Sequence, residues 1–289
     1  MPRYKTEQSR SKLPLACNGM DSPTTPKIFA PADALRGLVV CCWALDGVDA
    51  EPKQDVPDGC VDLLFAFGDR VEASVIGVAT RARSPSRPAP HVLGVTLAPG
   101  EALSILDVPL HELRDRTIPL AELWPRAPGL LDEMAAQRTI DVRVAVLQEA
   151  LAQRARRSRV AGSLRVRRGL RRLSEARGHL RISALAGSLG VSERQLERLF
   201  RERTGLGPKE MARVARMRSL LAHLATGRPS DWADLAYAFG FADQAHLIHE
   251  FQALTGKSPQ RYLGDANATT RQVDASGFYP VSEFSNPLP

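Results

Sequence analysis

The chain has 289 residues, of which 44% are hydrophobic and 25% charged, a composition typical of a globular protein with one or two domains. No uncharged apolar run approaches the roughly 20 residues of a membrane-spanning helix, and the polar, basic start of the chain has no apolar stretch like that of a secretory signal. Four cysteines without a CxxC pair disfavour a disulfide framework or a zinc site. We therefore expect a cytoplasmic protein with no membrane partner, no metal and no other cofactor.

Charge is unevenly distributed along the chain. Residues 1–150 contain 16 Lys and Arg against 20 Asp and Glu, a balance of −4, whereas residues 151–263 contain 22 against 9, a balance of +13. Residues 264–289 contain 1 against 3, which completes the net charge of +7. A basic C-terminal half beside a mildly acidic N-terminal half indicates a polyanion-binding module joined to another unit. Charge alone is equally compatible with a solvated basic surface.

The N-terminal half has the pattern of a strand-rich domain, which we expect over residues 26–140. Residues 1–25 are polar with scattered prolines and are predicted to be disordered. Four short apolar runs separated by Gly and Pro turns predict strands at residues 38–45, 61–67, 71–79 and 91–98. After Pro99 and Gly100 the apolar residues lie three and four apart, which predicts short helices.

A single amphipathic helix is predicted over residues 141–159, with Val142, Val146 and Leu147 on one side. Its arginine-rich end marks the start of the basic half, so we expect it to link the two domains. This helix would also suit a dimer interface. At the other end of the chain, residues 264–289 are predicted to form a polar, mostly disordered tail.

The basic segment, residues 160–263, contains an internal repeat of about fifty residues. The recurring motifs are Leu185-Ala186-x-x-x-Gly190 with Leu235-Ala236-x-x-x-Gly240, and Thr204-Gly205-x-x-Pro208 with Thr255-Gly256-x-x-Pro259. Each copy has the pattern of two helices joined by a tight turn, because the first glycine suits the left-handed position that ends a helix. Ser192 is a good N-cap for the next helix, and Asp243 occupies that place in the second copy.

The second helix of each copy has an apolar face and a polar outer face. In the first copy Leu196, Leu199 and Phe200 are expected in a core, and the outer residues are Arg194, Glu197, Arg198 and Arg201. We predict that this outer face contacts DNA bases or phosphates; the alternative is a solvated face in which Glu197 and Arg201 form an i,i+4 ion pair. The second copy has Gln244, Ala245, His246, Ile248 and His249 at its outer and flanking positions. Of these, Gln244, Ala245, His246 and His249 are predicted to contact DNA. The two histidines favour packing or hydrogen bonding over metal binding.

The two copies, LAGSLGVSERQLERLFRERTGLGP and LAYAFGFADQAHLIHEFQALTGKSPQRYL, resemble the DNA-binding domain of the AraC/XylS family of bacterial transcription regulators over about residues 160–263. The resemblance implies seven helices with two helix-turn-helix units, each placing one helix in the major groove. It implies base-reading positions at Arg194, Glu197 and Arg198 in the first unit and at Gln244, Ala245 and His249 in the second. The family often has Arg at the position of His249 and Lys or Arg at that of Gln252, so we expect the second unit to read DNA more weakly.

The N-terminal half resembles the regulatory domain of a subset of the same family. The resemblance lies in residues 56–65, 94–100 and 119–124 and implies a ligand-sensing or self-association module without identifying a ligand. The expected fold class is α+β, with a strand-rich, sensor-like domain followed by an all-α domain. The implied partners are a duplex promoter or operator, a small-molecule effector, a second copy of the chain and, for an activator, RNA polymerase.

Two other functions compete with this interpretation. Cys60, which lies between Asp58 and Asp62, or the pair Cys41 and Cys42, would serve a cysteine-dependent enzyme or an alkyl-acceptor DNA-repair protein. A reactive cysteine needs a lowered pKa, and acidic or apolar neighbours raise it instead, so we expect buried, non-catalytic thiols. An architectural DNA binder is the third candidate, although the strand-rich half is a large addition for such a protein.

Overall fold

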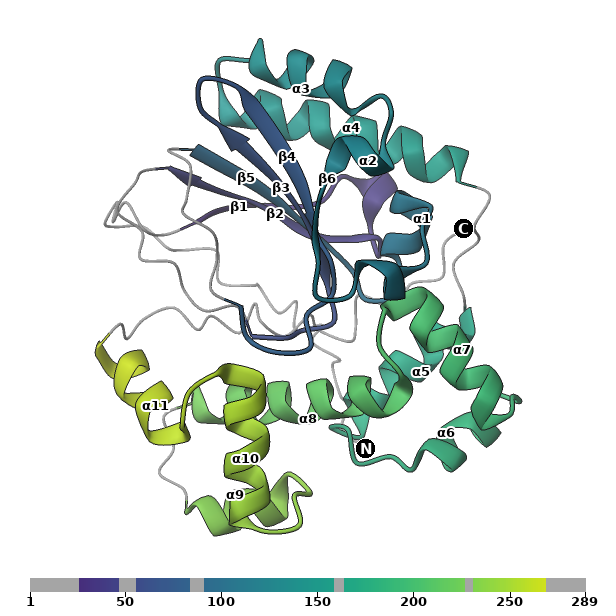
Figure 1. Ribbon diagram of the computed structural model, residues 1–289, viewed down its shortest axis with the longest axis vertical. Coiled ribbons are helices and arrows are strands. Elements are labelled where there is room, and N and C mark those ends of the chain that lie inside the picture. Colours follow the sequence, from purple (N-terminus) through teal and green to yellow (C-terminus); the bar gives the residue numbers. More distant parts are fainter. Residues whose placement is uncertain (1–25, 47–55, 84–90, 159–163, 227–230, 269–289) are drawn as a thin grey trace, which may run out of the picture.

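The computed structural model describes residues 26–46, 56–83, 91–158, 164–226 and 231–268 (Figure 1). A strand-rich part and a helical part form the two ends of the molecule, as the sequence predicts. The predicted disorder of residues 1–25 lies outside the described residues. The predicted tail, residues 264–289, was placed too early, because residues 264–268 continue the last helix; the rest of it lies outside the described residues. Among the helices of these described ranges, none has the length and apolar character needed to cross a membrane.

The strand-rich part is built on one antiparallel sheet with the strand order β1-β2-β5-β3-β4-β6. The strands are β1 (Lys27–Phe29), β2 (Val39–Asp46), β3 (Val61–Phe67), β4 (Val71–Ile76), β5 (His91–Leu97) and β6 (Thr117–Pro119). The four long strands correspond to the four predicted apolar runs. The two edge strands, β1 and β6, were not predicted, because three residues are too few to show the alternating pattern.

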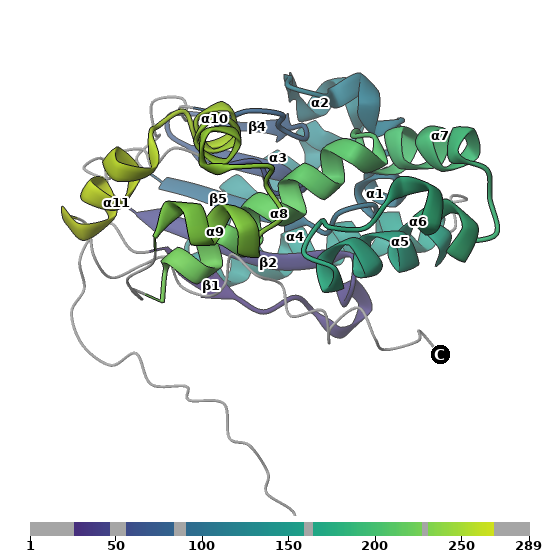
Figure 2. The same cartoon turned by 90° about the horizontal axis from the view of Figure 1, so that it is seen from below.

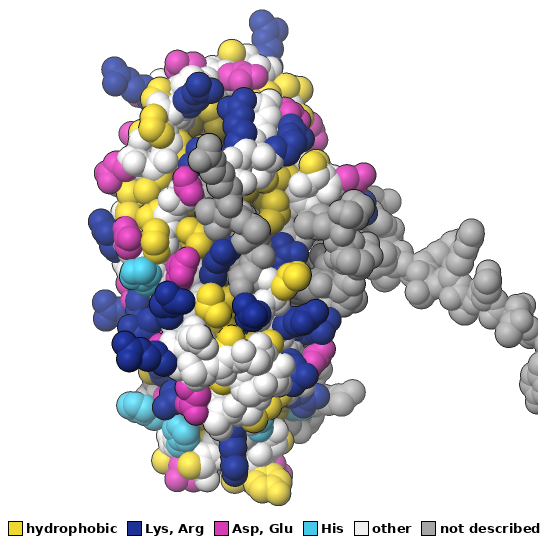
Figure 3. Space-filling model, turned by 90° about the vertical axis from the view of Figure 1, so that its right-hand side faces the viewer, with side chains coloured by type: hydrophobic (Ala, Val, Ile, Leu, Met, Phe, Trp, Pro, Cys, Tyr) yellow, Lys and Arg dark blue, Asp and Glu magenta, His cyan; other side chains and the backbone are white. Residues whose placement is uncertain are grey.

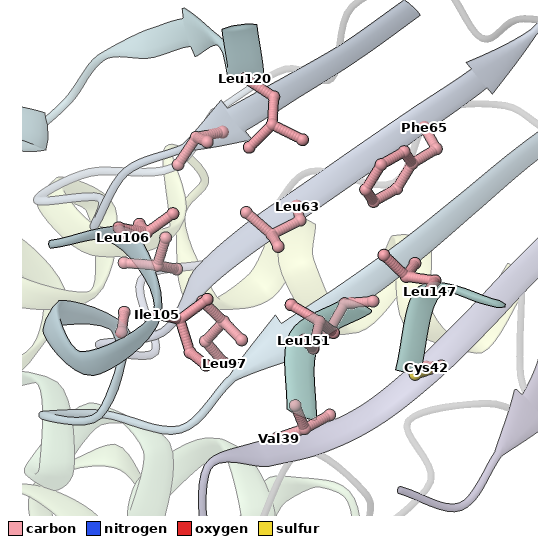
Figure 4. Packing of buried hydrophobic residues seen from close by; sticks show 14 of the residues in the cluster. Val39, Cys42, Leu63, Phe65, Leu97, Ile105, Leu106, Leu120, Leu147 and Leu151 are labelled. Carbon is pink, nitrogen blue, oxygen red and sulfur yellow. The ribbon is translucent and has the colours of Figure 1, made fainter. Parts of the chain in front are cut away.

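One face of this sheet is covered by helices. Along β3 buried and half-buried residues alternate, so that Leu63 and Phe65 point to the covered face. Helix α4 (Ile140–Arg157) lies across this face, and its Leu147 and Leu151 pack among the strand side chains (Figure 4). Alternation along the strands therefore decides which residues form the first hydrophobic core.

Helix α4 buries only part of the predicted apolar stripe: Leu147 is buried and Val146 packs against the first core, as predicted. Val144, Leu147 and Leu151 are buried, whereas Val142 is 44% exposed and its predicted place on the apolar side was wrong. The buried residues follow the i, i+3, i+7 spacing of one helix face, and Val142 lies outside it. Because this stripe belongs to the first core, α4 packs on the sheet over much of its length.

Short helices complete the N-terminal part. They are η1 (Asp33–Leu35), α1 (Ala102–Leu106), η2 (Leu110–Leu113), α2 (Leu120–Leu123) and α3 (Ala127–Ala135). The change of apolar spacing after Gly100 predicted this run of short helices. Helix α1 is fully buried, so its ends are held by contacts to other elements rather than by water.

The described residues from 164 to 268 contain seven helices, the number that the family resemblance implies. They are α5 (Leu164–Glu175), α6 (Ile182–Ser188), α7 (Glu193–Thr204), α8 (Pro208–Leu224), α9 (Trp232–Ala238), α10 (Gln244–Thr255) and α11 (Pro259–Ala268). Phe200 is buried in a second core around α5–α8, and Phe251 in a third around α8–α10. Helix α8 contributes to both and runs between the two units (Figure 2).

The two parts of the chain are docked through specific contacts. Arg167 on α5 donates to both carboxylate oxygens of Glu101, at 2.5 and 2.8 Å, and Glu101 is 1% exposed. Helix α7 packs against η2, where Gly205 lies so close to Val78 that a Cβ at position 205 would be 2.4 Å from its Cγ1. The side chain of Val78 belongs to the second core. The N-terminal part therefore contacts the first of the two helical units directly.

Candidate nucleic-acid interface

The first helix-turn-helix unit is formed by α6, a tight turn and α7. Gly190 follows the C-cap of α6 with φ +65°, the left-handed conformation predicted for it. The N-terminus of α7 is closed by a capping box, in which Ser192 Oγ accepts from the Gln195 N–H at 3.2 Å and Gln195 Oε1 accepts from the Ser192 N–H at 2.9 Å. Both sequence predictions for this turn are confirmed.

Helix α7 presents arginines on its outer face. Leu196 and Phe200 are buried in the second core, as predicted, and Leu199 is half-buried. Arg194 and Arg198 are exposed on the opposite side, one turn apart. Two exposed guanidinium groups at this spacing can reach adjacent positions along a major groove.

Glu197 is placed less favourably for contact with DNA. Its Oε1 accepts from Arg201 Nε at 2.7 Å, which is the i,i+4 ion pair considered as the alternative from the sequence. The same carboxylate lies over Gly207 in the connection to α8, where an added Cβ would be 2.7 Å from Oε1. Glu197 therefore packs against its own domain and also orients Arg201.

The second unit repeats this construction with α9 and α10. Gly240 has φ +68°, and the Asp243 side chain accepts from the His246 N–H at 2.7 Å, as an N-cap does. Leu247 and Phe251 are buried in the third core. Since the turn glycine and the N-cap occupy equivalent places in both copies, the sequence repeat is a structural repeat.

The outer face of α10 carries little charge. Gln244, Ala245 and His249 are exposed. His246 is half-buried: its Nδ1 accepts from the Ala242 N–H at 3.1 Å, and its ring packs edge-on against Phe241. The packing and hydrogen-bonding role expected for His246 is confirmed. Contact with DNA stays a prediction for His246, as it does for Gln244, Ala245 and His249.

A buried threonine lies at the C-terminal end of each recognition helix, and its role was not predicted from the sequence. The hydroxyl of Thr204 lies 2.8 Å from the Phe200 carbonyl oxygen and 2.9 Å from that of Leu206. Thr255 makes the corresponding contacts, at 2.7 and 3.0 Å, in the second unit. The Thr-Gly pair in the repeat was the available signal, because glycine takes the left-handed C-cap and threonine satisfies the adjacent carbonyls.

The arginines of α8 hold the units together. Arg213 donates from Nε and Nη2 to the carboxylate of Glu250 on α10, at 2.6 and 3.1 Å. Arg216 donates to the carbonyl oxygens of Gly240 and Gly178, at 3.0 and 3.2 Å. Arg218 donates to the Asp58 carbonyl in the N-terminal part. Their positive charge contributed to the predicted basic character, but their contacts are internal.

The side of the molecule where α7 lies is rich in positive charge. Figure 3 shows Lys and Arg side chains gathered over the lower half of this face, with His side chains beside them. Four exposed arginines of α5 add to the basic character of the helical part: Arg165, Arg168, Arg171 and Arg172. A polyanion approaching the first unit would meet a broad basic surface.

The described cysteines have the properties of structural thiols. Cys42 is buried, as predicted, whereas Cys41 is only half-buried, so its predicted burial was wrong. Burial raises the pKa of Cys42 to about 12 and also raises the pKa of Cys41. Cys60 is buried, and burial together with the Asp58 carboxylate raises its pKa well above the usual value. Cys17 lies outside the described residues. High pKa values keep a thiol protonated and unreactive, which disfavours a cysteine nucleophile.

Comparisons with known proteins agree with this geometry. Residues 185–265 match the family model of a helix-turn-helix domain, and residues 27–119 match that of a domain of unknown function, DUF6597. A segment of 77 residues is 38% identical to the HTH-type transcriptional regulator GlxA of Rhizobium meliloti. The chain is therefore similar to a transcription regulator over part of its length, in agreement with the resemblance to the AraC/XylS family. The matched segment covers 27% of this chain and 24% of GlxA, so the chain spans about a quarter of the length of this relative.

Two solved structures resemble parts of the chain at low identity. The C-terminal domain of AraT, a response regulator from Geobacillus stearothermophilus, is 22% identical and has a TM-score of 0.33, covering 41% of this chain and 93% of that domain. ToxT from Vibrio cholerae is 12% identical and has a TM-score of 0.41, covering 77% of this chain and 96% of ToxT.

Proposed function

We propose that the chain is a sequence-specific transcription regulator of the cytoplasm, in which residues 160–263 bind duplex DNA and residues 26–140 sense an effector or mediate self-association. The observation that carries this proposal is the repeated helix-turn-helix unit with exposed Arg194 and Arg198 on its first recognition helix. In such a unit the second helix enters the major groove, where guanidinium groups bind the O6 and N7 edge of guanine.

The proposed DNA-contacting residues fall into two groups. Arg194 and Arg198 are proposed to read bases, and Arg201 to bind phosphate beside its ion pair with Glu197. On α10, Gln244, Ala245 and His249 are proposed to make weaker contacts, whereas His246 supports the turn. The two recognition helices belong to one polypeptide, so we expect their contacts to lie about one helical turn apart, near 34 Å, on one face of the duplex.

The proposal is tested by selecting duplexes that bind the full chain from a random pool. The selected duplex is expected to bind at least tenfold more tightly than a scrambled one, and both affinities should fall steeply with salt, because each neutralised phosphate releases counterions. An affinity independent of salt, or no difference between the two duplexes, would contradict the proposal. A footprint of the bound duplex measures the spacing of the two contacts.

We also propose that the chain forms a homodimer and that, if it is an activator, it contacts RNA polymerase. A dimer predicts paired half-sites in the selected duplex, since operator symmetry follows protein symmetry. An activator is expected to raise transcription from a promoter carrying that duplex, and a repressor to lower it.

A further inference from the structure

A cavity of about 290 Å³ lies on the helical side of the N-terminal part, between α1, α3 and the last turns of α4. This volume is at the small end of the range of about 300–1,000 Å³ found for small-molecule sites. Its apolar wall comes from Trp124, Leu130 and Ala150. The cavity is outside the DNA-contacting surface, and nothing in the proposed DNA binding uses it.

The charged groups around this cavity are predominantly positive. Arg126, Arg154 and Arg157 line it, with Asp107 as the single carboxylate among the lining residues. No ion pair involving any of these three arginines is present in the described part of the chain. Three cations facing one carboxylate leave a local excess of positive charge, which favours an anionic occupant.

Arg154 is fixed at the centre of this arrangement. Its guanidinium group stacks over the Trp124 ring, 4.8 Å from the ring centroid, and its Nε donates to the carbonyl oxygen of Ile105. Trp124 Nε1 donates to the same oxygen at 3.3 Å. These contacts use one edge of the guanidinium group and leave its two terminal nitrogens for a ligand. Partial burial lowers the pKa of Arg154, and the nearby charge of Asp107 only partly offsets this effect.

We propose that this cavity is the effector site of the regulator, and that its ligand is a small organic carboxylate with a flat apolar body. The terminal nitrogens of Arg154 would bind the carboxylate in the fork geometry that guanidinium groups favour. The apolar body would lie against Leu130 and Ala150. This inference deepens the proposed function, on which its regulatory part rests.

Helix α1 connects the cavity to the DNA-binding part. Ile105 and Asp107 at its C-terminal end line the cavity, and Glu101 at its N-terminal end binds Arg167 of α5. The helix has five residues, so the two ends are only about 7 Å apart. A ligand that pulls on Arg154 therefore acts on the element that holds α5.

The test uses the full chain with phenylacetate, its neutral alcohol phenylethanol and inorganic phosphate, measured by titration calorimetry. Phenylacetate is expected to bind saturably, and phenylethanol and phosphate at least tenfold more weakly. Arg154→Gln should weaken phenylacetate binding at least tenfold. The matched control is Arg156→Gln on the same helix, whose side chain is exposed, pairs with Glu149 and does not line the cavity.

Two further variants keep the result interpretable if Arg154→Gln is unstable. Arg157→Gln removes an exposed lining charge and should weaken binding about threefold or more without affecting folding. Ala150→Phe fills the cavity and should abolish binding. Equal affinity of the Arg154 and Arg156 variants, equal binding of acid and alcohol, or no saturable binding of phenylacetate would each overturn the proposal.

DNA binding is measured on the same preparations to separate the two hypotheses. Binding of the selected duplex without binding of phenylacetate would contradict only the effector site. Binding of phenylacetate by a chain that does not recognise any selected duplex would contradict only the transcription-regulator function. A change in duplex affinity on adding phenylacetate, absent in Arg154→Gln, would support the coupling through α1.

Discussion

At the scale of single residues, the two recognition helices differ in charge. Arg198 on α7 exposes a positively charged guanidinium group, whereas the exposed residues of α10 are neutral. Bidentate contact between arginine and guanine contributes about 1–3 kcal/mol of discrimination, so Arg198→Ala is expected to cost about that much specific binding and to relax preference at one base position. His249→Ala should cost less.

Binding of both variants to the selected and the scrambled duplex separates base reading from phosphate contact. Arg156→Ala, on the opposite part of the molecule, is the control for loss of one positive charge. Equal losses of Arg198→Ala on both duplexes would show that Arg198 touches only phosphate. A larger loss of specific binding for His249→Ala than for Arg198→Ala would show that the second unit contributes more to sequence recognition than the first.

The cysteines give a second prediction at this scale. With a pKa of about 12, the Cys42 thiol is ionised to roughly one part in 10⁴ at pH 8. Iodoacetamide is therefore expected to modify Cys42 and Cys60 far more slowly in the native protein than in urea, in a Cys17→Ser background. Because the pKa is raised, the rate should stay low through neutral pH and rise only as the pH approaches 12. Fast native labelling of either thiol would restore the cysteine-enzyme hypothesis.

At the scale of elements, the turn glycines of the repeat make a matched set. Gly190 and Gly240 both have left-handed φ, but a Cβ at Gly190 meets open space and one at Gly240 meets the ring of His179 at 2.2 Å. Gly190→Ala is expected to lower the free energy of unfolding by about 1–2 kcal/mol through φ alone, and Gly240→Ala by more. Gly187, inside α6 with open space around it, is the control, and Gly187→Ala should stabilise by about 0.5–1 kcal/mol. Urea unfolding of the three variants measures this order.

The helices and strands also differ in how well the sequence alone predicts them. Long strands and the repeated helices were predicted because their apolar periods extend over many residues, and the caps at Ser192 and Asp243 because capping chemistry is local. The placement of α4 was harder. An amphipathic stripe indicates that a face is buried but not which partner covers it, and α4 is covered by the sheet. The internal role of Arg216 was also hidden, since its two carbonyl partners are 24 and 38 residues away.

At the scale of the whole molecule, the docking of the two parts depends on a few charged contacts that no local pattern predicts. Three ion pairs cross between the parts: Arg167 with Glu101, Arg114 with Glu210, and Arg218 with Asp58. Arg167 and Arg218 belong to the helical part, and Arg114 belongs to the N-terminal part. The members of each pair are far apart in sequence, so local patterns of residues give no signal of their proximity. These contacts join the N-terminal part to α5 and α8, the helices on either side of the first helix-turn-helix unit.

The Arg167–Glu101 pair yields the last prediction. Glu101 is 1% exposed, so Arg167→Met leaves a buried carboxylate without its partner, which typically costs about 3–5 kcal/mol. The double variant Arg167→Met with Glu101→Met removes both charges and is expected to recover much of that loss. Arg171→Met, in the exposed i,i+4 pair with Glu175, should cost only about 0.3–0.5 kcal/mol. Denaturant unfolding gives the free energies, and the two parts are expected to unfold separately in Arg167→Met alone. If the double variant were as unstable as the single one, the pair would owe its importance to packing rather than to the uncompensated charge.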